Sequence, residues 1–363
     1  MDNKKTLCVV AGSSGGHILP ALSICRKWLQ KKPDGRILFI SGTKKIDKSV
    51  LKGQQLFSYH CSLSLQTFSF EKFWLYPYFC MQFVISFFKS FFHLIRLRPS
   101  SVVSTGGHIS IPVVLAAKLL GIPVELYELN VIPGRTIRAL APLSKKVFTT
   151  FEKSKTFFKD SKKRAYKYET CNYPLQFNEE EVGFNKTGVF RFINQCIKDS
   201  RIGLQLSFTR KRKTLFILGG SQGSIYLNTL LKKWFLQHKD SIENFQIIHQ
   251  TGSEDKTDWD VFYQALEIPY FVFSYSSDIR DFYLLADYVV SRAGAGSLFE
   301  LEFFKKNSLI IPLVSQAKNH QVVNAQEMVK RNPDIFSMCD PRDIEKDSSV
   351  FYNAVHSLIE TNN

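Results

Sequence analysis

The stretch CVVAGSSGGHILPAL (8–22) contains a histidine directly behind two glycines, at the start of a helical pattern. An apolar run precedes this turn, and Ser14, Gly15 and Gly16 come immediately before His17. Glycine lets the backbone approach a ligand closely, and the first N–H groups of a helix can bind an anion. Imidazole can accept or donate a proton near neutral pH. The spacing therefore favours proton transfer beside bound negative charge.

Three more glycine-rich turns follow apolar runs. They are STGGHISIP (104–112), GGSQGS (219–224) and SRAGAGSLFE (291–300). Each turn alone is a weak signal. Parallel strands, however, bring their carboxyl ends to one edge of a sheet, where such sheets bind ligands. Four turns of this kind predict a ligand crevice at the carboxyl ends of the strands.

The turns do not match the common nucleotide motifs. None continues as G-K-[ST], so a Walker-type phosphate loop is not indicated. The second predicted strand ends in FISGTKK, without the acid that a nicotinamide dinucleotide needs, so a dehydrogenase is disfavoured. A different carboxylate, Glu300, follows the fourth turn and could accept both hydroxyls of a ribose. The alternative for Glu300 is a surface position near the favourable end of a helix dipole.

Two further polar clusters follow predicted strand ends. In IPLVSQAKNHQVVNA, residues His320, Gln321 and Asn324 begin a helical pattern and suit diphosphate or sugar hydroxyls. In YELNVIPGR, the turn signal NVIPG follows a strand and carries Glu128 and Asn130 past its end. We expect these side chains to point into the same crevice.

Alternating strands and helices must position these turns, and both halves of the sequence show that alternation. Short continuous apolar runs separated by helical patterns indicate parallel sheets covered on both faces. Two such series predict an α/β fold with two doubly wound domains. The predicted strands are 6–11, 36–41, 101–105, 123–128, 146–150, 214–219, 245–251, 270–275, 288–292 and 308–313.

A proline and a run of acids interrupt the alternation in CNYPLQFNEEE (171–181), which indicates a domain boundary there. We expect a first domain in 1–170 and a second in 171–345. The remaining 346–363 predicts a C-terminal helix, and a return of this helix to the first domain is left open. The polar stretch 178–213 carries no functional prediction.

The composition suggests a substantial hydrophobic core and an anionic partner. The 363 residues carry a net charge of +16, and 44% of them are hydrophobic. The charge excess suggests a polyanion, with a solvated basic surface as the alternative. Zinc-finger, RNP-type and basic-zipper patterns are absent from the sequence, so lipid or phosphate is favoured over nucleic acid. The seven scattered cysteines form no C-x-x-C pair, and MDNKKT lacks a signal-peptide core; both fit a reducing cytoplasm.

The segment 70–99 breaks the alternation with an aromatic, apolar run flanked by Lys and Arg. Its uncharged part, 73–88, contains a proline and is shorter than the roughly 20 residues that span a bilayer. Polar residues recur at helical spacing and predict one narrow polar stripe; they are Gln82, Ser86, Lys89, His93 and Arg96. A core helix is one interpretation, and a face lying in a membrane interface is the other; the two overlap, since one side could face the core and the other lipid. The predicted membrane contacts are Lys72, Phe73, Trp74, Lys89, Arg96 and Arg98.

Seven motifs, in order from about residue 6 to 340, resemble the MurG family of glycosyltransferases: GSSGGHILPAL, STGGHISIP, YELNVIPG, GGSQG, HQTG, SRAGAGSLFEL and IP…NHQVVNA. The resemblance implies a GT-B fold, with two Rossmann-like domains facing each other across a cleft. It implies inverting transfer of N-acetylglucosamine from UDP-N-acetylglucosamine to undecaprenyl-diphosphate-linked muramyl pentapeptide (lipid I to lipid II). This reaction belongs to peptidoglycan synthesis, and so to cell shape and division. No metal or other cofactor is implied.

The resemblance also implies roles for residues that match the motifs. His17 is the candidate catalytic base. The first domain is expected to face the acceptor and the membrane, and the second to bind the UDP-sugar. The acceptor and phosphate loops would be formed by Ser14, Gly15, Gly16, Gly106, Gly107 and Asn130. The donor would be bound by Ser221, Gln222, Gly223, Glu300, His320 and Gln321.

The chain departs from the family pattern in several motifs. Serines stand where the first loop usually shows Gly-Thr, and histidine stands for tyrosine in the second. The usual Gln, Asp and interdomain Arg are also replaced. The departing residues are Ser13, Ser14, His108, Leu129, Asn319 and Gln176.

Two other functions are compatible with the sequence. One is GT-B transfer to another lipid acceptor such as diacylglycerol, which the acceptor loops 104–112 and 127–135 would decide. The other is a non-catalytic membrane-surface binder of a UDP-sugar, which the departures suggest and the presence of His17 and Glu300 disfavours. We expect a peripheral protein at the cytoplasmic face of the plasma membrane, with an anionic membrane surface as partner and no nucleic acid.

Overall fold

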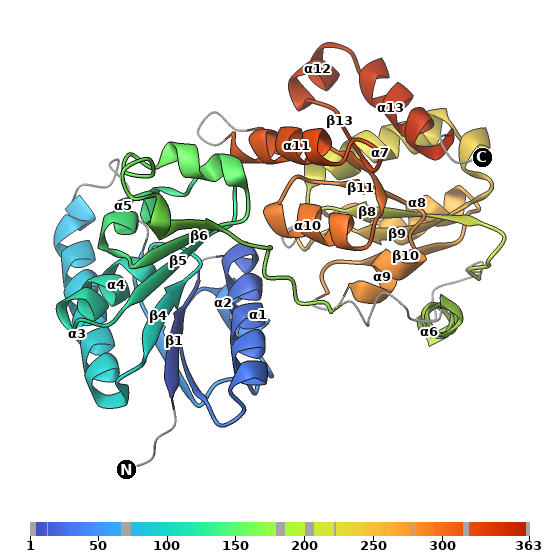
Figure 1. Cartoon of the computed structure of the whole chain (residues 1–363). Coiled ribbons are helices and arrows are strands. Elements are labelled where there is room, and N and C mark those ends of the chain that lie inside the picture. The colour runs from blue at the N-terminus through green and yellow to red at the C-terminus, as the bar shows by residue number, and fades with distance from the viewer. Residues whose placement is uncertain are drawn as a thin grey trace. The chain divides into compact units, whose positions relative to one another are not determined.

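The structure is a computed structural model of the 363-residue chain. It describes residues 5–12, 14–66, 74–178, 186–199, 207–220, 223–276, 279–314 and 319–360. The chain divides into two compact units, Met1–Gln176 and Phe177–Asn363, which are described separately (Figure 1).

The first unit is built on a seven-stranded sheet in which all strands pair in parallel. The strands are β1 (Thr6–Val10), β2 (Arg36–Gly42), β3 (Tyr59–Leu63), β4 (Ser101–Ser104), β5 (Val124–Glu128), β6 (Lys146–Thr149) and β7 (Tyr168–Thr170). Their order is β3-β2-β1-β4-β5-β6-β7. The apolar run at β1 is fully buried at the middle of the sheet, where Cys8 lies beside Leu38 and Val102.

Helices cover both faces of this sheet (Figure 1). They are α1 (Gly15–Lys31), α2 (Lys45–Leu51), α3 (Tyr76–Leu97), α4 (Ser110–Leu119) and α5 (Arg135–Leu140), with the 3₁₀ turns η2 (Ala141–Leu143), η3 (Glu152–Phe157) and η4 (Ala165–Lys167). Alternate residues of a strand point to opposite faces. Leu7 of β1 accordingly packs with α1, whereas Cys8 packs on the face covered by α3, α4 and α5.

The second unit repeats the design with a six-stranded parallel sheet. Its strands are β8 (Lys213–Leu218), β9 (Phe245–Gln250), β10 (Tyr270–Phe273), β11 (Tyr288–Ser291), β12 (Asn307–Ile310) and β13 (Phe336–Met338). Their order is β10-β9-β8-β11-β12-β13. Its helices are α6 (Lys186–Asp199), α7 (Ile225–Gln237), α8 (Trp259–Ala265), α9 (Arg280–Leu285), α10 (Ala295–Phe303), α11 (His320–Arg331), α12 (Pro341–Lys346) and α13 (Ser349–Glu360), with the 3₁₀ turn η6 (Asp240–Ile242). The two parallel sheets confirm the predicted pair of doubly wound domains.

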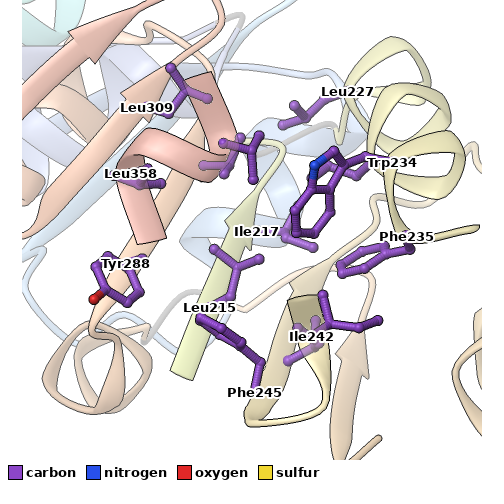
Figure 2. Packing of buried hydrophobic residues seen from close by; sticks show 14 of the residues in the cluster. Leu215, Ile217, Leu227, Trp234, Phe235, Ile242, Phe245, Tyr288, Leu309 and Leu358 are labelled. Atoms are coloured by element: carbon purple, nitrogen blue, oxygen red, sulfur yellow. The ribbon is translucent and has the colours of Figure 1, made fainter. Parts of the chain in front are cut away.

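The core of the second unit includes the last helix of the chain. Leu215 and Ile217 of β8 share one apolar cluster with Trp234 and Phe235 of α7 and with Leu358 of α13 (Figure 2). The C-terminal helix α13 therefore belongs to the second unit's own core.

Helix α3 exposes apolar side chains and buries polar ones. Its buried residues are Phe79, Gln82, Ser86, Ser90 and Leu94. Its exposed large apolar residues are Tyr78, Met81, Val84, Ile85, Phe88, Phe92 and Ile95. The buried polar groups are satisfied inside the protein: Gln82 Oε1 accepts the Gln66 backbone N–H at 3.0 Å, and Ser90 Oγ donates to the Ser86 carbonyl at 2.7 Å.

The first residues of the predicted polar stripe, Gln82 and Ser86, lie on the buried side of α3, and its cations reach the surface. Lys89 and Arg96 are exposed, and Lys89 Nζ donates to the Ser62 carbonyl at 2.8 Å. The helix is long and apolar enough to cross a membrane, with mean hydropathy 1.4, and 28% of that stretch is buried in protein. The helix therefore has one side in the core and the other side exposed.

Candidate active site

His17 lies in the first turn of α1 and is fixed by the second glycine loop. Its Nδ1 lies 2.8 Å from the Thr105 carbonyl, and Thr105 Oγ1 donates to the His17 carbonyl at 2.9 Å. A carbonyl only accepts, so Nδ1 must carry the proton and Nε2 holds the basic lone pair. Ser14 precedes α1, and its backbone carbonyl accepts the His17 N–H at 3.2 Å. The half-buried imidazole is thus set in the tautomer that a general base needs.

The second glycine loop is held rigidly against the first. Ser104 Oγ accepts the Gly106 N–H at 3.1 Å and donates to Ser110 Oγ at 2.7 Å. Gly107 has φ +88°, and a Cβ there would lie 2.8 Å from the Gly12 carbonyl oxygen. The two loops therefore meet backbone to backbone, which only glycine allows.

Glu128 lies under the turn that carries Asn130. Its side chain is 2% exposed and accepts the backbone N–H groups of Asn130 and Gly134, both at 2.9 Å. Burial raises the pKa of the Glu128 carboxyl to about 7, although these hydrogen bonds lower it. The expectation that Glu128 points into a crevice is wrong, because its oxygens are turned back onto its own turn. It is a positioning residue for Asn130.

Two departures from the family pattern have clear structural positions. His108 Nε2 lies 2.6 Å from the Leu65 carbonyl, and burial lowers the pKa of the His108 imidazole although that bond raises it. Leu129 is 2% exposed and packs in the interior. Ser13 lies outside the described residues.

The third glycine loop, which follows β8 in the second unit, is also built on glycine contacts. Ser224 caps α7 by accepting the Leu227 N–H at 3.2 Å. Gly223 has φ +77°, and a Cβ there would lie 2.4 Å from the Gly252 Cα. The loops after β8 and β9 are therefore pressed together beside the N-terminus of α7. Ser221 and Gln222 lie outside the described residues.

Replacing Gly223 with alanine is expected to destabilise the second unit by at least about 3 kcal/mol. A left-handed backbone costs a non-glycine residue about 1–2 kcal/mol, and the added methyl group would also overlap backbone atoms that cannot move aside. Gly220→Ala is the matched control, because Gly220 has φ +83° with no atom within 4 Å of its Cβ position. Urea unfolding of both variants measures the difference, and equal losses would contradict the close contact.

Glu300 lies on α10 and is bound by a buried tyrosine. Tyr283 Oη donates to Glu300 Oε2 at 2.8 Å. Burial raises the pKa of the Glu300 carboxyl to about 7, and the Tyr283 hydrogen bond opposes that rise. One carboxylate oxygen is thereby fixed by the protein, which sets the direction of the other.

The helix after β12 carries the remaining predicted donor residues. His320 is the first residue of α11, and Asn319 stands at its N-cap. Gln321 Oε1 accepts the Leu313 backbone N–H at 2.8 Å. This bond ties the start of α11 to the strand end, and Asn324 is fully buried one turn later.

Arg292 in the fourth glycine loop was not predicted. Its side chain is 7% exposed, and Nη1 donates to the Ile311 and Pro312 carbonyls at 3.2 and 3.3 Å. The guanidinium lies over the Tyr226 ring at 5.6 Å, and burial lowers its pKa to about 10. A buried cation at this edge of the sheet would attract an anionic ligand. The arginine of SRAGAG is visible in the sequence, but nothing there distinguishes it from an ordinary surface arginine.

The HQTG motif forms a buried network that sequence reasoning did not resolve. His249 Nε2 lies 3.1 Å from Asn228 Oδ1, and its Nδ1 lies 3.0 Å from Tyr263 Oη. Asn228 Nδ2 donates to the Thr251 carbonyl at 2.9 Å and to Asp255 Oδ2 at 2.6 Å. The network holds the backbone that contacts Gly223, so it positions the glycine loop that follows β8.

Burial lowers the pKa of His249 to about 3, so this group makes stability fall as pH falls below about 6.5. The contribution of His249 to the free energy of unfolding is complete above its pKa in the unfolded chain, about 6.5. It is lost as the pH falls toward its pKa in the folded protein, about 3. We expect the stability advantage of the wild type over His249→Gln to shrink by about 1 kcal/mol between pH 6.5 and 5.5. Urea unfolding at both pH values measures it. The raised pKa values of Glu128 and Glu300 change stability with pH in the opposite direction, but both residues are present in both proteins, so their effects cancel. A stability difference between wild type and variant that does not change with pH would contradict a neutral His249.

Each unit thus gathers part of the predicted site. The first unit brings His17, Gly106 and Gly107 together, and the second presses Gly223 beside the α7 N-terminus. Among the residues that the structure describes, no group of three or more His, Cys, Asp or Glu could hold a metal ion.

The glycosyltransferase family 28 N-terminal domain matches residues 7–149, and the family 28 C-terminal domain matches residues 214–338. The chain belongs to glycosyltransferase family 28 and has the two Rossmann-like domains of the GT-B fold. Among solved structures it resembles Acinetobacter baumannii MurG, with a TM-score of 0.67 and 21% identity over 98% of this chain and 90% of that one. It also resembles UDP-GlcNAc 2-epimerase from Neisseria meningitidis, with a TM-score of 0.59 and 13% identity over 91% and 92%. At these identities the two likenesses show the fold.

Curated relatives carry one activity name. The proteins of Desulfotalea psychrophila and Thermotoga maritima are both called UDP-N-acetylglucosamine–N-acetylmuramyl-(pentapeptide) pyrophosphoryl-undecaprenol N-acetylglucosamine transferase. The first is 28% identical over 90% of this chain and 82% of its own length. The second is 29% identical over 88% and 84%. They confirm the resemblance to the MurG family.

Proposed function

We propose that the chain transfers N-acetylglucosamine from UDP-N-acetylglucosamine to the lipid-linked muramyl pentapeptide, with inversion at the anomeric carbon. The carrying observation is the similarity to relatives named for this activity along about 90% of the chain. The fixed tautomer of His17 supports a catalytic rather than a purely binding role.

His17 would act as the general base. Its Nε2 would take the proton of the acceptor C4 hydroxyl while that oxygen attacks the anomeric carbon and UDP leaves. The His17 Nδ1–H remains bonded to the Thr105 carbonyl, which stabilises the imidazolium that forms. Asn130, fixed by Glu128, would contact the acceptor.

The second unit would hold the donor. The second carboxylate oxygen, Glu300 Oε1, would accept the ribose hydroxyls, and His320 and Gln321 would contact the sugar and phosphates. The α7 N-terminus and the Gly223 backbone would stabilise the departing diphosphate through N–H groups and the helix dipole. Ser221 and Gln222 belong to the same loop.

The exposed apolar face of α3 would bind the cytoplasmic face of the plasma membrane. A lipid-linked acceptor cannot leave the bilayer, so the enzyme must reach its surface. Trp74 is 62% exposed just before the helix, and Lys89, Arg96 and Arg98 are exposed along it. Aromatic side chains enter the interface while cations meet anionic headgroups. Lys72 and Phe73, also proposed as contacts, lie outside the described residues.

The direct test is UDP release from UDP-N-acetylglucosamine with a soluble analogue of the muramyl lipid precursor. Release that depends on this acceptor supports the proposal. Release only with diacylglycerol would support the other lipid acceptor. Binding of the nucleotide sugar without turnover on any acceptor would support the non-catalytic binder.

A further inference from the structure

Tyr275 carries a buried hydroxyl that the site described above does not use. The residue follows the end of β10, two positions beyond Phe273. Its Oη is buried and has no hydrogen-bond partner within the part of the chain that the structure describes. A buried hydroxyl without a partner is costly, because it has given up water and gained nothing in exchange. Such a group needs an explanation, and a ligand that it can bind is one.

The Tyr275 hydroxyl is a neighbour of Glu300. Burial raises the pKa of the Tyr275 phenol, and the negative charge of Glu300 raises it further. Tyr283 is the other tyrosine beside this carboxylate, and its Oη already donates to Glu300 Oε2 at 2.8 Å. Two phenol groups therefore approach Glu300. One is engaged by the carboxylate, and the other keeps a proton to donate.

An apolar wall of aromatic rings lies behind this group. The Tyr283 ring stacks on Phe304, with centroids 5.1 Å apart and an interplanar angle of 18°. Phe177 packs edge-on against Phe304 at 5.1 Å, and Phe216 packs edge-on against Tyr283 at 5.6 Å. All four rings are buried. A hydrogen bond made against such a wall is electrostatically stronger than one made in water.

A ribose hydroxyl needs both an acceptor and a donor. The ionised Glu300 carboxylate can only accept, so a hydroxyl that gives its proton to Glu300 still has lone pairs to satisfy. A phenol O–H can donate to those lone pairs. The Glu300 carboxylate and the Tyr275 hydroxyl together therefore match both capacities of one ribose hydroxyl.

We propose that Tyr275 is a second ribose contact, whose Oη donates to a ribose hydroxyl oxygen while that hydroxyl donates to Glu300. The inference rests on the proposed function, because it takes Glu300 as the ribose-binding acid. The desolvation of Tyr275 is complete before the nucleotide binds, so the new bond replaces no bond to water. The pair would also select ribonucleotides, since a sugar without these hydroxyls leaves both protein groups unpaired.

Tyr275→Phe removes only the hydroxyl, and its expected effects on affinity and stability have opposite signs. Calorimetric titration with UDP, at about pH 8 and therefore above the Glu300 pKa of about 7, should show about tenfold weaker binding. The urea midpoint of unfolding should be equal to that of wild type or higher, because an unpaired buried hydroxyl has been removed. A hydroxyl that supported the fold would lower both quantities.

Tyr288→Phe is the matched control. Tyr288 also has a buried Oη without a hydrogen-bond partner among the described residues, but its ring packs in the cluster that contains α7 and α13 (Figure 2). This variant should likewise keep its urea midpoint. Its affinity for UDP should stay within about twofold of wild type.

A change of ligand locates the contact on the sugar. Dideoxyuridine diphosphate lacks both ribose hydroxyls, so Tyr275→Phe should bind it within about twofold of wild type. In the transfer assay, the KM for UDP-N-acetylglucosamine should rise about tenfold in Tyr275→Phe, while kcat stays within about twofold. This split is expected because the ribose is remote from the bond that breaks.

Glu300→Gln separates failure of this inference from failure of the proposed donor site. If Glu300→Gln weakens UDP binding and Tyr275→Phe does not, the second ribose contact is overturned and the donor site stands. An equal loss with UDP and dideoxyuridine diphosphate, or a lowered urea midpoint in Tyr275→Phe, would also overturn the contact. If wild type does not bind UDP, or Glu300→Gln binds it normally, the proposed donor site fails and the inference fails with it.

Discussion

His17→Ala is expected to lower acceptor-dependent UDP release by about 10²- to 10⁴-fold, the usual contribution of a positioned general base. We expect this to be the largest effect of a single substitution, because the Thr105 carbonyl holds the proton on Nδ1 and leaves the basic lone pair on Nε2. The rate is measured with saturating UDP-N-acetylglucosamine and the soluble acceptor analogue. Donor binding, measured separately, should not change.

A second substitution separates chemistry from structure. His17→Asn keeps an N–H donor at the position of Nδ1 for the Thr105 carbonyl but supplies no base, so it should be as inactive as His17→Ala. Recovery of activity with asparagine would return His17 to a purely structural role. His60→Gln is the matched control: His60 is another histidine of the same unit, bonded to Ser41 at 2.9 Å, and its variant should retain activity.

Phe88→Ser combined with Phe92→Ser is expected to reduce binding to anionic vesicles by at least about tenfold. These side chains are 52% and 66% exposed, so their loss removes apolar area from a membrane contact while leaving the core intact. Removal of apolar area from water contributes about 25 cal/mol per Å², and two phenylalanines supply more than enough area for this effect. Flotation with phosphatidylglycerol vesicles measures the change.

The control for this variant lies in the second unit. Leu236→Ser with Val261→Ser removes two apolar residues that are 54% and 61% exposed. Membrane binding should be unaffected there, and UDP release on a soluble acceptor should be normal in both double variants. A parallel loss in the two would mean that general surface apolarity, rather than α3, attracts the bilayer.

The sequence predicted the central strands well, because buried parallel strands are continuous apolar runs. The run LFIL in β8, for example, predicts a buried strand with little ambiguity. The strands β3, β7 and β13 were missed, since YHCSL, YET and FSM are short, partly polar and close to the sheet edges. Such strands are specified by pairing with distant neighbours more than by their own pattern.

The orientation of α3 could not be predicted from periodicity. A repeat tells which side chains share a helix face, but not which face meets the protein. Gln82 turned inward because the Gln66 backbone, supplied by another segment, satisfies its amide. The apolar side of the helix was then left exposed.

The types of the candidate site residues were visible in the sequence, but their contacts were not. His17 and Thr105 are separated by 88 positions, so the bond that sets the tautomer depends on the fold. Glu128 looked like a ligand-facing acid, and only its two backbone hydrogen bonds reveal that it holds its own turn.

The backbone contact between Gly12 and Gly107 means that substitutions in two loops far apart in the sequence constrain each other. A side chain added at Gly107 would meet the Gly12 carbonyl, and one added at Gly12 would meet Ile109 and the Gly42 nitrogen. Neither loop can therefore be enlarged at these positions without rebuilding the other. If the enzyme is evolved in the laboratory for a different acceptor specificity, we expect the selected substitutions to fall at other positions near the acceptor. Both glycines should be retained.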